Sequence, residues 1–69
     1  MAKWQKPLVQ LAQSGQAVSQ SELEVIVEQV KQSPSVRLAS VQPERHGKIE
    51  VQVTERDNTP HAWQFPVKR

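Results

Sequence analysis

A chain of 69 residues with 36% hydrophobic side chains has material for one core, so the sequence predicts a single small domain over residues 1–69. Nine basic and seven acidic side chains leave a net charge of +2, which permits an anionic partner without requiring one. The absence of cysteine excludes disulfides, thiolate metal sites and cysteine nucleophiles. A core this small would gain stability from a second subunit.

The sequence shows no targeting or membrane signal. Met1-Ala2-Lys3 leads into polar residues, and nowhere do 18 apolar residues follow one another. We therefore expect no signal peptide and no transmembrane helix, and we expect the protein in the cytoplasm.

The first predicted element is a short helix over residues 7–14. Pro7 suits the first helical turn, leucines follow at helical spacing, and Gly15 suits the left-handed position that closes a helix. Trp4 lies just before this helix. We expect Trp4 to pack against the domain, with exposure to a protein partner as the alternative.

The second predicted element is a longer helix from about Ser21 to Gln32, which Pro34 stops. Its start offers two overlapping capping boxes, Ser19 with Glu22 and Ser21 with Glu24. One face is apolar and faces the core, formed by Leu23, Ile26, Val27 and Val30. A strand over residues 24–30 is the alternative, because Val25, Ile26 and Val27 are β-branched, but the caps and the proline favour the helix.

Val25 lies on the side of this helix opposite the apolar face. An isolated exposed valine is ordinary in soluble proteins. The alternative is that Val25, together with Trp4, belongs to a contact surface for another protein.

Three strands are predicted in the second half of the chain. Residues 35–41 alternate, with Val36 and Leu38 expected on one face and Arg37, Ala39 and Val41 on the other. Residues 48–67 form a hairpin with two alternating runs, Ile49, Val51 and Val53 in one and Trp63, Phe65 and Val67 in the other.

The expected sheet is a meander with residues 49–53 in its middle strand, because Pro66 lacks the N–H group that a central strand must donate. The fold class is therefore α+β: two helices packed on one face of a three-stranded antiparallel sheet, in the order α-α-β-β-β. In topology alone this arrangement resembles small sheet-reading DNA-binding domains such as the arm-binding domains of integrases. No motif of the sequence assigns the chain to that family.

The sequence lacks the signatures of catalysis. His46 and His61 stand 15 residues apart without a ligand pattern, and both are expected at the surface. With only two glycines, no glycine-rich phosphate loop exists. We expect no enzyme activity, no cofactor, no metal and no small-molecule substrate.

One basic cluster is a candidate nucleic-acid site. In a meander, the turn at residues 42–47 and the carboxyl-terminal tail fall at the same end of the sheet. The basic rim predicted there consists of Arg45, His46, Lys48, Lys68 and Arg69. A solvated basic edge would look the same in the sequence.

Two features of the sequence weaken a nucleic-acid function. The outer sheet face is expected to present Arg37, Lys48, Glu50, Gln52 and Gln64, without an aromatic ring on which bases would stack. A helix-turn-helix with residues 21–32 in the groove would expose glutamates to phosphates. We therefore expect a small regulatory protein that acts through protein contacts or self-association, with nucleic-acid binding by the basic rim as the alternative.

Overall fold

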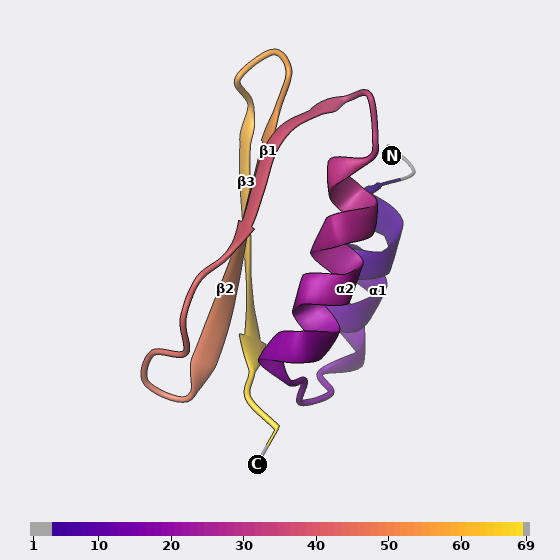
Figure 1. Cartoon of the computed structure of the whole chain (residues 1–69). Helices are drawn as coiled ribbons and strands as arrows, with labels where there is room; N and C mark the ends of the chain where they lie inside the picture. The colour runs from indigo at the N-terminus through magenta and orange to yellow at the C-terminus, as the bar shows by residue number, and fades with distance from the viewer. Residues whose placement is uncertain (1–3, 69) are drawn as a thin grey trace.

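The computed structural model describes residues 4–68. The strands form one antiparallel sheet with β2 in the middle, and both helices cover the same face of that sheet (Figure 1). The predicted fold class and chain order are confirmed. The elements in order are α1 (Gln5–Ser14), α2 (Gln20–Lys31), β1 (Val36–Val41), β2 (Lys48–Glu55) and β3 (Pro60–Pro66).

Helix α1 begins two residues before Pro7, the predicted start. This extension costs little, because the N–H groups of a first helical turn have no partner within the helix and proline lacks only that group. Gly15 follows the helix with φ 68°, so the predicted left-handed closure is confirmed.

Of the two possible capping boxes, α2 uses Ser19 with Glu22. The Ser19 hydroxyl accepts a hydrogen bond from the Glu22 backbone N–H and lies 3.2 Å from the Glu22 carboxylate. Lys31 in the last turn pairs with Glu28 at 3.3 Å. The predicted bounds of this helix are correct to within one residue.

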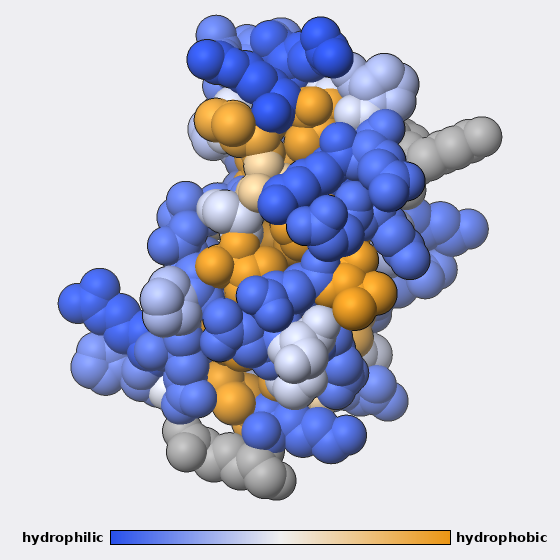
Figure 2. Space-filling view, in the orientation of Figure 1, coloured by the Kyte–Doolittle hydropathy of each residue, from blue (hydrophilic) through white to orange (hydrophobic). Residues whose placement is uncertain are grey.

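The core fills the space between the helices and the sheet. Helix α2 packs mainly on β1, and α1 packs on β3. Figure 2 shows hydrophobic side chains emerging along the seam between the two layers, interrupted by hydrophilic residues. The buried hydrophobic residues are Trp4, Leu8, Val18, Leu23, Val27, Val30, Val36, Ile49, Val51, Val53 and Phe65.

Strand β1 corrects one prediction. A β-bulge lies between Val36 and Leu38, so these two residues do not share a face. Val36 is buried, whereas Leu38 is 61% exposed on the outer face. Ala39 and Val41 pack against the core instead, because the extra residue at the bulge reverses the alternation that follows it.

The two edges of the sheet differ. Val18, in the link between the helices, bonds alongside the end of β3: its N–H donates to the Pro66 carbonyl at 2.9 Å, and its carbonyl accepts from the Lys68 N–H at 2.8 Å. Strand β1 has no neighbouring strand on its outer side within the described residues. Neither helix in this part of the chain has the length and apolar character that a membrane crossing requires.

Candidate functional site

A groove of about 530 Å³ lies on the outer face of the sheet, away from the helices. Its wall is the turn between β1 and β2, where Arg45 and Lys48 exchange backbone hydrogen bonds of 2.8 and 3.1 Å. His46 and Gly47 between them both have positive φ, as in the tight hairpin turns that match strand twist. The residues lining the groove are Gln42, Pro43, Glu44, Arg45, His46, Lys48, Glu50, Gln52 and Gln64.

Glu50 carries a negative charge on the outer strand face in this groove. The amides of Gln52 and Gln64 both donate hydrogen bonds to its carboxylate. These bonds, led by the one from Gln52, lower the pKa of the Glu50 carboxyl below its ordinary value of 4.5. The carboxylate therefore stays ionised at neutral pH.

The turn and the tail lie at the same end of the sheet, because the Val67 N–H donates to the Gly47 carbonyl at 3.1 Å. Arg45, His46 and Lys48 thus share the groove, with Lys68 nearby in the tail. Arg69, the last residue of the predicted rim, lies outside the described residues.

Charge in the groove is balanced rather than basic. Arg45 and Lys48 supply positive charge, whereas Glu44 and Glu50 supply an equal negative charge. A phosphate backbone would meet both signs here. Mixed charges and side-chain amides are better suited to a protein surface than to a polyanion.

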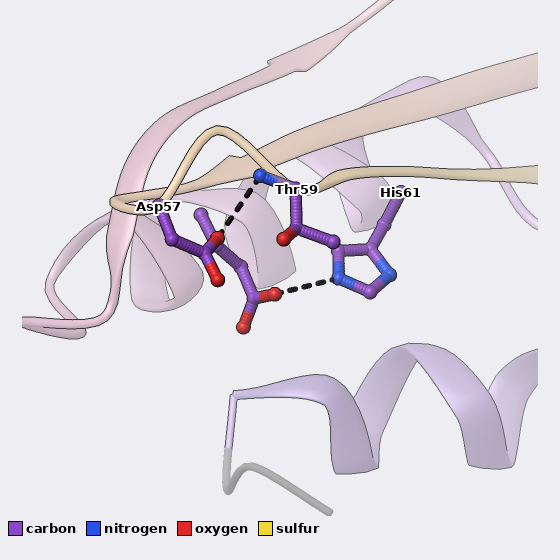
Figure 3. Close-up of polar contacts among 4 residues, drawn as sticks. Asp57, Thr59 and His61 are labelled. Atoms are coloured by element: carbon purple, nitrogen blue, oxygen red, sulfur yellow. Dashed lines mark hydrogen bonds and ion pairs between the residues drawn. The ribbon is translucent and has the colours of Figure 1, made fainter.

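A second cluster occupies the opposite end of the sheet and corrects the expectation for His61. Its side chain is 25% exposed, and its Nε2 lies 3.0 Å from the Glu55 carboxylate. Figure 3 shows this contact beside the bond from the Thr59 N–H to Asp57, at 3.0 Å. His46 is exposed, as predicted.

Trp4 and Val25, the predicted contact residues, have opposite environments. Trp4 is 5% exposed and forms a T-shaped pair with the ring of His61, so it packs against the domain and offers no free contact surface. Val25 is 61% exposed on α2. The two do not form one surface patch.

The structure also shows a second groove, of about 260 Å³, between α2 and β1. Leu38 on the outer face of the same strand is exposed. The sequence pattern predicts this strand at an open edge of the sheet, and open sheet edges are among the features that favour protein contacts. The exposure of Leu38 was not predicted, because the expected alternation places Leu38 on the same face as the buried Val36. Residues lining this groove are Glu24, Val27, Glu28, Lys31, Ala39, Ser40 and Val41.

No group of three or more potential metal-ligating side chains occurs among residues 4–68. The chain matches no known protein family, and comparison with curated proteins and with solved structures finds no match either.

Proposed function

We propose that this chain is a small, non-enzymatic protein-binding module whose contact surface is the open edge of β1. We define the β1 edge as the backbone of residues 38–41 on the side away from β2. The proposal rests on one observation: this uncharged segment lies at a sheet edge and exposes Leu38. Open edges of this kind accept an added strand from another protein.

Backbone direction at the β1 edge follows from one hydrogen bond. The Gln42 N–H donates to the Glu50 carbonyl at 2.8 Å, so the polar groups of Gln42 face β2. Alternation along an antiparallel ladder turns the N–H and carbonyl groups of Ala39 and Val41 the other way. A partner strand would find donors and acceptors at these two residues.

Side chains on both faces of β1 suit such a partner. Ala39 and Val41 line the groove beside α2, where Val27 adds apolar surface. Leu38 lies on the opposite face of the sheet. An added strand would therefore cover apolar side chains on both sides while its backbone completes the ladder.

Selection of binders from a displayed library of random peptides tests this function. Peptides are titrated into ¹⁵N-labelled protein, and the expected footprint is a shift of the Ala39 and Val41 amide signals. The Ala39→Pro variant should lose binding, because proline removes an N–H group that faces the partner. Footprints confined to the groove around Glu50, or no selected peptide, would contradict the proposal.

Nucleic-acid binding is the second candidate, supported by the gathering of Arg45, His46 and Lys48 in one groove with Lys68 nearby. Fluorescence anisotropy with labelled duplex and single-stranded DNA tests it, at about 50 and 200 mM salt, where phosphate-dominated affinity collapses. Replacing Arg45 and Lys48 by glutamine should remove any such binding. An affinity independent of salt and of these residues would exclude the basic rim.

A further inference from the structure

We propose that the β1 edge binds an extended segment of another protein, antiparallel to β1, in which a lysine or arginine stands two residues before an apolar residue. This inference rests on the proposed function, because it names the chemistry of the strand that would occupy the same surface. The basic side chain would enter the groove between α2 and β1 and meet the Glu24 carboxylate. A single added strand brings no second helix against α2, so only its side chains share this groove.

The short length of the β1 edge fixes which partner residues reach the groove. The bulge at Arg37 interrupts regular pairing on one side. On the other side, Pro43 is the next residue after Val41 in the outward alternation, and it has no N–H to donate. Backbone pairing is therefore confined to Ala39 and Val41. The partner residues directly opposite these two are two positions apart, and both point toward the helices, as Ala39 and Val41 do.

The groove has two different ends. Helix α2 runs antiparallel to β1 (Figure 1), so Glu24 in its second turn lies toward the Val41 end of the groove. Lys31 in the last turn lies toward the Ala39 end. The order of the two partner side chains therefore decides which charge each of them meets.

Charge distinguishes these two ends. Glu28 and Lys31 pair with each other at 3.3 Å, so their charges largely cancel. Glu24 is exposed and forms no ion pair with any residue between positions 4 and 68. The groove therefore keeps one uncompensated carboxylate, at the end beside Val41. A lysine or arginine opposite Val41 would compensate it, whereas a glutamate there would be repelled.

Apolar contacts specify the second partner position. Ala39 and Val41 pack against the core, and Val27 lines the same groove. An apolar side chain opposite Ala39 would extend this core, while the methylene stem of the basic residue covers Val41. Antiparallel pairing continues the antiparallel sheet and puts the basic residue first. The reverse order in the same strand direction would place the cation beside Lys31.

A displayed library of extended peptides of about eight residues tests this order, with threonine at the fixed positions for its strand propensity. Two positions, two residues apart, are randomised, and the full chain is the target. At the first position we expect lysine or arginine to be enriched about three- to fivefold over glutamate, the scale of one exposed ion pair. At the second we expect apolar residues. Equal enrichment of lysine and glutamate would overturn the inference.

Charge reversal at Glu24 supplies the matched comparison. Selection against the Glu24→Lys variant should favour glutamate or aspartate at the first position. Glu44→Lys is the control, because it makes the same change of net charge in the groove on the outer face of the sheet. This control should keep the preference for a basic residue. A preference that reverses in both variants would reflect net charge alone and would overturn the inference.

Spectra of the ¹⁵N-labelled natural chain separate the failure of this inference from that of the proposed function. The most enriched basic peptide and its glutamate counterpart are titrated in turn. Both should shift the Ala39 and Val41 amide signals, and the glutamate peptide should bind about three- to fivefold more weakly. Footprints at these amides without a charge preference would overturn this inference and leave the proposed function intact. With no footprint at the β1 edge, both proposals fail.

Discussion

The imidazole of His61 stacks on the indole of Trp63, with ring centroids 5.7 Å apart and planes inclined by 11°. Trp4 meets the same imidazole edge-on at 5.3 Å and meets Trp63 at 6.0 Å. Because Trp4 precedes α1 and the other two rings belong to β3, these contacts hold the beginning of the helical layer against the sheet.

Replacing His61 by alanine should lower the free energy of unfolding by about 1–3 kcal/mol, through lost ring contacts and the lost bond to Glu55. Urea denaturation followed by tryptophan fluorescence measures this directly, since both tryptophans adjoin His61. His46→Asn is the matched control, because asparagine tolerates the positive φ of this exposed turn residue. Equal midpoints for both variants would show that the ring cluster contributes no stability.

Asp57 should make stability depend on acid pH. Hydrogen bonds from the side chain and then the backbone of Thr59 lower the pKa of the Asp57 carboxyl below its ordinary value of 3.8. A depressed folded pKa contributes stability above the unfolded value, and this contribution is lost as the pH falls through the folded pKa. The stability advantage of the natural chain over Asp57→Asn should therefore shrink on acidification below about pH 4. Urea midpoints across the acid range check this, and a constant difference would contradict it.

Glu50 allows the two glutamine bonds to be compared within one titration. Carboxyl ¹³C signals should report a pKa of Glu50 below 4.5 in the natural chain. Gln52→Ala should return it further toward the ordinary value than Gln64→Ala, because the bond from Gln52 is the larger cause. A pKa unaffected by both substitutions would show that the two amides do not bond this carboxylate in solution.

Two serines near the start of α2, Ser19 and Ser21, have similar sequence signals, but Ser19 caps the helix in the structure. Ser19→Ala should cost about 1 kcal/mol of stability, because the Glu22 N–H loses its acceptor. Ser21→Ala, inside the helix, should change stability by less than about 0.5 kcal/mol. Thermal or urea unfolding of the two variants measures the difference. A larger loss for Ser21→Ala would show that Ser21, and not Ser19, caps the helix.

Much of the fold follows from local patterns. Four features depend only on residues within or next to one element: the alternation in β2, the capping box at Ser19, the closure at Gly15 and the edge position of Pro66. The bulge in β1 breaks this rule, because nothing in the alternation of Val36 and Leu38 marks an extra residue between them. It accompanies long-range contacts: Arg37 donates to Asn58 in the hairpin between β2 and β3.

The candidate sites divide in the same way. Grouping of Arg45, His46 and Lys48 follows from their closeness in the sequence and from the predicted turn. The hydrogen bond from Gln64 to Glu50 does not, because it joins residues 14 positions apart and depends on strand register. The edge position of β1 was predicted, but the exposure of Leu38 was not, since a one-residue shift exchanges the two faces of a strand.

By itself, the sequence determined which segments become helices and strands and which strand lies in the middle of the sheet. These features depend on periodicity, caps and proline. Only the tertiary structure decided where β1 bulges, which edge stays open and that His61 joins Trp4 and Trp63 in one ring cluster. These features arise from contacts between residues far apart in the chain. Their geometry exists only after the layers have packed, so no local pattern records it.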